Sequence, residues 1–237
     1  MGLEEKVEDA INFIVEASEE LDPELPWELG FSGGKDSTTV LALLMEAMRR
    51  GARIQKLYVV YADTLLEHPE LRRRTLEALE SLKVFPNVEP VRLVPQEDFI
   101  TMMVERGYPA PSHRFRWCMA RLKIRPMQDF MRKLGRFVQV SGVRVGESPE
   151  RAKNIMRYGR AVKLVKTENP VLMPILDWTT RDVFEFLRTR KRWDGKDFNY
   201  LLDLYGVEEN ADCGCAVTTD VRFGCWVCTV VKNDKMP

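Results

Sequence analysis

Residues 27–51 read WELGFSGGKDSTTVLALLMEAMRRG, and this stretch decides the fold of the chain. Its first five residues form a short apolar run that predicts a buried strand, and residues 38–50 repeat apolar side chains at helical spacing. Between them, Gly33 and Gly34 allow a tight turn and a close approach of the backbone to a ligand. Amides at the start of a helix point outward at the positive end of its dipole. The stretch therefore predicts a strand, a glycine turn and a helix that together bind phosphate.

The predicted phosphate loop consists of Ser32, Gly33, Gly34, Lys35, Asp36 and Ser37. Its spacing is not that of the Walker loop, which places four residues between a first glycine and a Gly-Lys-Ser/Thr triplet. The loop resembles the pyrophosphate loop of ATP pyrophosphatases and of phosphoadenosine phosphosulfate (PAPS) reductases, which hold the diphosphate of a nucleotide. This resemblance implies that the six residues bind ATP and that Lys35 and Asp36 serve catalysis. The alternative is a tight turn with Asp36 or Ser37 as a plain helix cap.

Strand and helix patterns alternate along the rest of the chain. Strand patterns cover residues 27–31, 54–61, 88–94, 137–143 and 171–176, with helical patterns between them at 67–84 and 96–106 and after them from 179 and at 198–205. This alternation predicts a Rossmann-like parallel sheet of five strands with helices on both faces, which the resemblance makes adenine nucleotide alpha hydrolase-like. We expect a nucleotide-binding domain over 1–208 and a cysteine-rich segment over 209–237 packed on it. Residues 152–169 are basic and irregular, and predict a flap over the site.

The composition limits the classes of partner. The 237 residues are 45% hydrophobic, and 36 basic residues balance 36 acidic ones, so any contact with nucleic acid needs a local basic patch. The acidic amphipathic start lacks the features of a signal peptide, and no apolar run is long enough to span a membrane. We expect a cytoplasmic protein, in which five cysteines serve as ligands or nucleophiles rather than as disulfides.

The end of the second predicted strand carries a second motif. Asp63-Thr64-Leu65-Leu66-Glu67 resembles the Asp-Thr-Gly-x-Glu signature of the PAPS reductase family, with Leu65 in place of the glycine. Ligands of parallel sheets bind beyond the carboxyl ends of the strands. Asp63 and Thr64 are therefore candidates to contact the ribose or adenine, and a helix cap with an acidic turn is the alternative.

A third motif follows the fourth predicted strand. Residues 142–151, GVRVGESPER, match the Gly-x-Arg-x-x-(Glu/Gln)-Ser-x-x-Arg pattern of the same family. The resemblance implies that Gly142 approaches the adenosine and that Arg144 and Arg151 neutralise phosphate or sulfate oxygens during catalysis. A surface loop with an internal Glu-Arg pair is the alternative.

Residues 112–136 form a strongly basic stretch, with eight arginines and lysines against the single acid Asp129. A solvated helix face accounts for the later charges. The earlier ones flank Trp117 and Cys118, and are better candidates to hold an anionic substrate such as DNA.

Four cysteines follow in the tail, at Cys213, Cys215, Cys225 and Cys228. Together with Cys118 they offer five donors for a four-ligand metal site, and their spacing leaves zinc and iron-sulfur open. Free buried cysteines are a further alternative.

The segments around these cysteines resemble the iron-sulfur signature of the DNA phosphorothioation sulfurtransferases, the DndC family, within the PAPS reductase superfamily. The matching residues are RFGCWVC at 222–228 and Trp117-Cys118-x-x-Arg121-Leu122-Lys123. The resemblance implies a [4Fe-4S] cluster on Cys118, Cys215, Cys225 and Cys228, with Cys213 as the alternative to Cys215 and Trp117 in place of a further cysteine. Family members extend beyond the cluster motif, whereas this sequence stops at Pro237.

The leading hypothesis is therefore an iron-sulfur ATP pyrophosphatase that uses ATP and Mg²⁺ to activate a phosphate or nucleic-acid target for sulfur insertion. The resemblance implies DNA phosphorothioation, with a cysteine desulfurase or another sulfur donor and partner subunits of a modification complex.

Three alternatives stay open. An assimilatory reductase of adenylyl sulfate or PAPS would release sulfite, although the family's Glu-Cys-Gly-x-His tail is not found and the histidines are only His68 and His113. A nucleotide-sensing subunit of a DNA-modification complex would use zinc as a structural staple. A tRNA-thiolating enzyme would bind a different nucleic acid.

Overall fold

The computed structural model describes residues 1–112, 114–145, 161–163, 169–207 and 225–227. One six-stranded sheet runs in the order β3-β2-β1-β4-β6-β5. The strands are β1 (Trp27–Gly30), β2 (Leu57–Ala62), β3 (Val88–Leu93), β4 (Val138–Val140), β5 (Ala161–Lys163) and β6 (Pro170–Leu172). β1, β2, β3, β4 and β6 are parallel, which confirms the predicted five-stranded parallel sheet.

The sheet also contains a strand that the sequence did not predict. β5 pairs antiparallel with β6 at the sheet edge, in the register Ala161↔Leu172, Val162↔Val171 and Lys163↔Pro170. β5 lies within residues 152–169, which the sequence predicts to be an irregular flap. That prediction is wrong for residues 161–163, because their backbone pairs with β6 at the edge of the sheet. Residues 152–160 and 164–168 of the predicted flap lie outside the described residues, and Asn169 accepts from the Phe137 amide at 3.1 Å.

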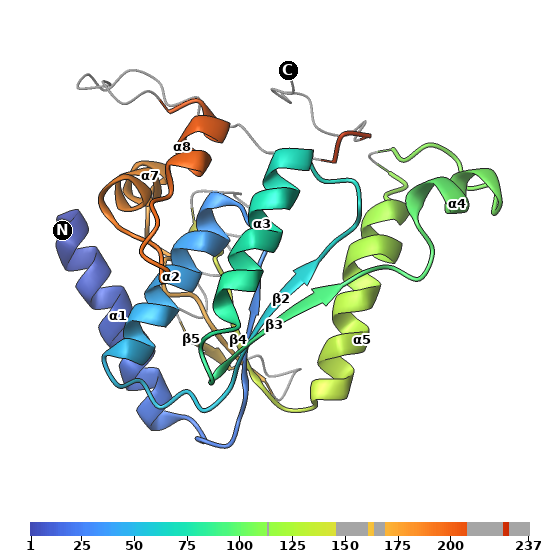
Figure 1. Cartoon of the computed structure of the whole chain (residues 1–237). Coiled ribbons are helices and arrows are strands. Elements are labelled where there is room, and N and C mark those ends of the chain that lie inside the picture. Colours follow the sequence, from blue (N-terminus) through green and yellow to red (C-terminus); the bar gives the residue numbers. More distant parts are fainter. Residues whose placement is uncertain (113, 146–160, 164–168, 208–224, 228–237) are drawn as a thin grey trace.

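The helices cover the sheet unequally (Figure 1). On one face lie α1 (Leu3–Glu20), α2 (Lys35–Arg49), α3 (Pro69–Leu82), α7 (Thr180–Thr189) and α8 (Asn199–Tyr205). After β3 the chain returns across the sheet through α4 (Phe99–Val104), the π-helix η1 (Met119–Ile124) and α5 (Arg125–Leu134). Because parallel crossovers are right-handed, this reversal of direction puts α5 on the opposite face. Among the described residues, every helix is too short or too polar to span a bilayer.

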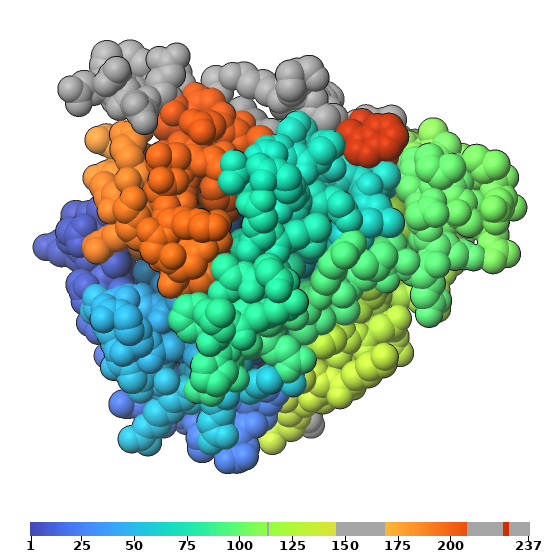
Figure 2. Space-filling view, in the orientation of Figure 1, coloured from blue at the N-terminus to red at the C-terminus, as the bar shows by residue number. Residues whose placement is uncertain are grey.

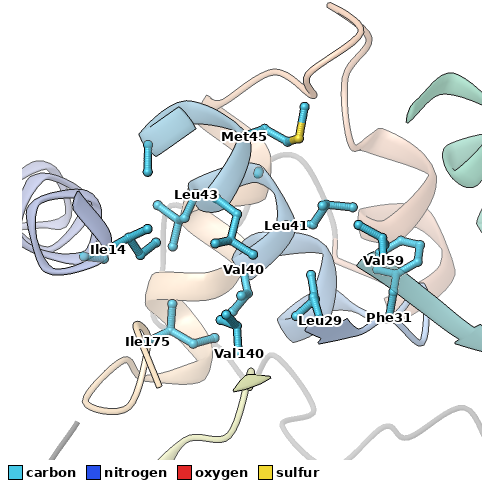
Figure 3. Packing of buried hydrophobic residues seen from close by; sticks show 14 of the residues in the cluster. Ile14, Leu29, Phe31, Val40, Leu41, Leu43, Met45, Val59, Val140 and Ile175 are labelled. Atoms are coloured by element: carbon cyan, nitrogen blue, oxygen red, sulfur yellow. The ribbon is translucent and has the colours of Figure 1, made fainter. Parts of the chain in front are cut away.

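The main apolar core lies between the sheet and α2. Ten of the fifteen residues of α2 are buried, and Val40, Leu41 and Leu43 pack against β1, β4 and the chain after β6. Figure 3 shows Val40 beside Val140 and Leu29, Leu41 toward Val59 and Phe31, and Leu43 toward Ile14 of α1. Because α2 is held on several sides, the turn that precedes it has a fixed position.

The opposite face of the sheet contains a buried acid. Glu28 lies in register with Tyr58 of β2 and Gln139 of β4, and it is 0% exposed. Neither of its carboxylate oxygens has a hydrogen-bond partner of good geometry within the described part of the chain. Burial raises the pKa of Glu28 to about 7, against a smaller opposing effect of the Gln139 side chain. Below about pH 7 this carboxyl group is therefore neutral, on the strand that leads into the phosphate loop.

Candidate functional site

The predicted phosphate loop joins β1 to α2 at the carboxyl edge of the sheet. Gly33 has φ +71°, and a Cβ atom placed there would lie 1.9 Å from the Thr75 hydroxyl oxygen of α3. The amide of Ser32 donates to the Ser37 hydroxyl at 3.2 Å, and that hydroxyl donates to the Gly34 carbonyl at 3.1 Å. The loop is therefore a closed turn that only glycine fits at position 33.

A buried ion-pair network fixes the start of α2. Asp36 accepts from the Lys35 ammonium at 2.8 Å and from the Arg144 Nε at 2.7 Å. Arg144 is 3% exposed and also donates to the Trp178 carbonyl at 3.3 Å and to the Thr180 hydroxyl at 3.2 Å. Arg144 thus holds Asp36, which in turn holds Lys35. Its predicted role as a direct phosphate ligand stays a prediction, and Arg151 lies outside the described residues.

Two further residues close around the loop. A Cβ atom at Gly142 would lie 3.3 Å from the Asp36 carbonyl carbon and oxygen, so the backbone after β4 approaches the loop itself. The Lys35 ammonium lies 5.4 Å from the ring centre of Tyr205, at the end of α8. The predicted contact of Gly142 with adenosine stays a prediction. Tyr205 had no signal in the sequence beyond the apolar spacing of its helix.

Asp63 directly follows β2, the strand next to β1, and is 0% exposed. Its carboxylate accepts hydrogen bonds from Nε and Nη2 of Arg72, each at 2.9 Å, and from Nε of Arg92 at 2.8 Å. The Arg92 Nη2 lies 2.7 Å from the same carboxylate as an ion pair. Burial alone raises the pKa of Asp63, but the hydrogen bonds from Arg72, the Leu65 amide and Arg92 outweigh it and lower the pKa. An ionised Asp63 is thus built into the carboxyl edge, and sequence reasoning missed both arginines.

The residues after Asp63 form a tight turn. The Thr64 hydroxyl donates to the Glu67 carboxylate at 2.8 Å. Leu65 has φ +66°, the left-handed conformation that favours glycine, at the position where the family signature has that residue. The departure from the signature therefore keeps the backbone shape of a glycine turn.

Cys118 and Cys225 meet at a small apolar cluster, which we call the cysteine cluster. Its buried residues are Leu66, Phe99, Met102, Trp117 and Leu122, and both cysteines are partly buried against it. Glu67 pairs with Cys225 in an isolated antiparallel bridge, and the Trp226 amide donates to the Leu66 carbonyl at 3.0 Å. Residues 225–227 therefore lie beside the turn between β2 and α3, as the red segment of Figure 1 shows.

Trp117, in the place of a further family cysteine, belongs to the packing of this cluster. Its ring stacks on Phe99 with 5.2 Å between ring centres, and its indole nitrogen donates to the Pro109 carbonyl at 2.8 Å. Within the described residues no group of three or more potential metal ligands is found. The other predicted ligands, Cys213, Cys215 and Cys228, lie outside the described residues, so the ligand set stays a prediction.

The comparisons with known proteins agree with this arrangement. Residues 28–230 match the model of the phosphoadenosine phosphosulfate reductase domain. The chain belongs to this family. Solved structures share its fold: PAPS reductase from Candida auris in complex with phosphate has a TM-score of 0.53 at 15% identity, covering 91% of this chain and 94% of that one. NMN synthetase from Francisella tularensis has a TM-score of 0.50 at 14% identity, covering 88% and 83%. FMN adenylyltransferase from Candida glabrata has a TM-score of 0.50 at 14% identity, covering 80% and 57%.

Two curated relatives come from Methanocaldococcus jannaschii. The uncharacterized protein MJ0973 is 29% identical over 206 residues, and the uncharacterized protein MJ0066 is 29% identical over 230 residues. These matches cover 86% and 96% of this chain but 41% of each relative, so the chain spans about two fifths of their length. The predicted closeness to the DndC family stays a prediction.

Proposed function

We propose that this PAPS reductase family domain is an ATP pyrophosphatase that activates its target for sulfur transfer. The observation that carries the proposal is the glycine turn closed by Thr75, with Lys35 beside it and braced through Asp36 by the buried Arg144. Amides at the start of α2 and the Lys35 ammonium would bind the diphosphate of ATP, with Mg²⁺ offsetting its remaining charge.

The proposed reaction has two steps. An oxygen of the target attacks the α phosphorus of ATP, the bond to the bridging oxygen breaks, and pyrophosphate leaves with that electron pair. The terminal sulfur of a donor persulfide then attacks the activated atom, and AMP leaves with the original oxygen. A thiol next attacks the inner sulfur of the donor and forms a disulfide with it, so that the S–S bond breaks and its electron pair stays on the sulfur now bound to the target. Lys35 stabilises the charge that develops on the leaving diphosphate, and Asp36 and Arg144 keep its ammonium in place.

The cysteine cluster is the proposed metal site. Two thiols reach it from distant parts of the chain, and it borders the end of β2 beside the loop. Cys118 and Cys225, with Cys228 and either Cys215 or Cys213, would hold a [4Fe-4S] cluster or zinc. A [4Fe-4S] cluster would supply or present sulfur, whereas zinc would serve as a structural staple.

The proposed target is a nucleic acid, with DNA phosphorothioation as the reaction that the resemblance implies. The basic stretch at residues 112–136 would contact it. A cysteine desulfurase or another donor would provide sulfur, and partner subunits would select the site to be modified.

The test is Mg²⁺-dependent release of pyrophosphate from ATP by anaerobically purified protein in the presence of DNA, which supplies the attacking oxygen. Lys35→Ala should reduce the rate about 100-fold, because it removes one preorganised positive charge from the leaving diphosphate. Lys56→Ala, which removes a lysine just before β2 at the opposite edge of the sheet, should leave the rate unchanged. Equal turnover by Lys35→Ala and the parent would contradict the proposal.

Metal analysis and an absorption spectrum of the same preparation test the cysteine cluster. We expect iron, sulfide and a broad visible absorption, all lost in Cys118→Ser and Cys225→Ser. A colourless protein with one zinc per chain and no turnover would instead support the nucleotide-sensing subunit.

The family match keeps one other activity in competition, the reduction of a sulfonucleotide. Sulfite release from adenylyl sulfate or PAPS with thioredoxin, without pyrophosphate release from ATP, would favour the reductase.

A further inference from the structure

A groove of about 550 Å³ opens beside the cysteine cluster, between the exit of β3 and one side of η1 and α5. Arg121, Arg125, Asp129 and Lys133 follow one another every four residues along its helical wall. Residues at that spacing share one face of a helix and lie roughly 6 Å apart along its axis. The wall is therefore a row of three cations and one acid.

The cations of this row are available, whereas the acids of the groove are not. Within the described part of the chain, Arg121, Arg125 and Lys133 are exposed and form no ion pair, and Arg121 has only a 3.3 Å contact with the Tyr108 hydroxyl. Asp129 pairs with Arg132, and Glu97 of the opposite wall pairs with Arg106. The groove therefore favours a ligand with several negative charges in a row.

Two exposed aromatic residues lie beside residues of the cysteine cluster, which adjoins this groove. Met102 belongs to both the groove and the cysteine cluster, so the two are contiguous. Trp226 is 54% exposed between Cys225 and Val227, which both pack on that cluster. Phe115 is 48% exposed, two residues before the buried Trp117. Figure 2 shows residues 225–227 in red on the surface beside the green segment that carries α4.

We infer that the groove and these two rings form a binding site for an unpaired nucleic-acid strand. Its phosphates contact Arg121, Arg125 and Lys133, and its bases stack on Phe115 and Trp226. A duplex buries the faces of its bases against one another, so rings placed this way recognise only unpaired bases. The inference specifies the target of the proposed function. Modification of the strand rests on the proposed function, whereas binding of the strand does not.

The first test is fluorescence anisotropy of the full chain, without ATP, on a labelled single strand of about 12 nucleotides and on its duplex. We expect the single strand to bind about tenfold more tightly. Arg121→Ala/Arg125→Ala/Lys133→Ala should weaken binding at least about tenfold and lower the slope of affinity against salt by about 2, since about 0.7 is lost per phosphate contact. The matched control, Arg53→Ala/Lys83→Ala/Arg188→Ala, removes the same charge from exposed positions outside the groove and should change the affinity less than about threefold.

The rings are tested separately from the charges. Trp226→Ala and Phe115→Ala should each weaken strand binding about tenfold without changing the salt slope, and Val84→Ala, at an exposed apolar position after α3, should have no effect. Equal affinity for the duplex with no effect of the ring substitutions would overturn the inference. So would equal competition by polyglutamate, which offers charge without bases. Strand binding is measured without ATP, and pyrophosphate release is measured with ATP, Mg²⁺ and saturating DNA. Binding without pyrophosphate release would remove the proposed function and leave strand binding standing.

Discussion

The phosphate loop and the cysteine cluster lie at the same edge of the sheet but are held by different forces. Directional bonds fix the loop: hydrogen bonds between neighbouring residues close the turn, and Lys35 and Arg144 both bind Asp36. Packing fixes the cluster, where stacked rings bring Cys118 and Cys225 together from distant segments. An added methyl group should therefore disrupt the phosphate loop, whereas removal of a packed side chain should disrupt the cysteine cluster.

Gly33→Ala should have the largest effect and should be confined to the loop. The new methyl group clashes with Thr75 and the backbone keeps a positive φ, which together cost about 4 kcal/mol of unfolding free energy. We expect loss of ATP binding by calorimetry, with the metal content unchanged.

Two variants separate the causes. Gly33→Ala/Thr75→Ala should recover part of the stability, because the hydroxyl and methyl of Thr75 are gone. Gly51→Ala keeps a positive φ of 101° with open space around it and should lose only about 1 kcal/mol. A Gly33→Ala protein that binds ATP normally would show that the loop can shift away from Thr75 without losing its binding geometry.

Trp117→Ala should give the opposite pattern. Removing a buried ring that stacks on Phe99 should cost about 3 kcal/mol in urea unfolding and lower the metal content. ATP binding should persist. Trp117→Phe should retain most of both the stability and the metal. If Trp117→Ala also abolished ATP binding, the two regions would act as one unit.

Glu28→Gln tests the buried acid of β1, the strand that leads into the phosphate loop. The folded chain holds the Glu28 proton up to about pH 7, whereas the unfolded chain releases it near 4.5. The stabilisation due to the neutral acid is thus fully present below pH 4.5 and is lost as the pH rises to about 7. The neutral amide avoids this loss, so we expect Glu28→Gln to be more stable than the parent by about 3 kcal/mol at pH 8.

At pH 4.5 the two proteins should have nearly equal stability. Chemical denaturation across this range measures the difference, and a gap that did not depend on pH would mean that Glu28 is not the titrating group.

Leu65→Gly should have the smallest effect, at the turn that links the two regions. Relief of the positive φ raises the unfolding free energy of the variant by about 1 kcal/mol. Glycine also gives the unfolded chain more conformational entropy, which lowers that gain by about half. The net gain of about 0.5 kcal/mol would appear as a small rise in Tm. A loss of stability would show that the Leu65 side chain contributes contacts despite its exposure.

The sequence predicted what local pattern encodes. Apolar runs placed the five parallel strands, and the glycine turn placed the loop, because both depend on residues close together in the chain. β5 escaped prediction because its three residues form a strand only by pairing with β6. Arg72, Arg92 and Tyr205 escaped because their positions depend on how separate elements pack. Glu28 read as an ordinary polar strand residue, and only the register of the sheet shows that it is buried.

All ten residues of α5 are described and none is buried, in contrast to the ten buried residues of α2. The backbone amides of α5 should therefore exchange with deuterium through brief local opening, whereas those of α2 should exchange only when the whole domain unfolds. Each opening of α5 uncovers its side of the sheet and admits water toward Glu28. After correction for the base-catalysed rise in exchange that all amides show, deuterium uptake by α5 should increase above pH 7, because the ionised Glu28 favours the open, hydrated form.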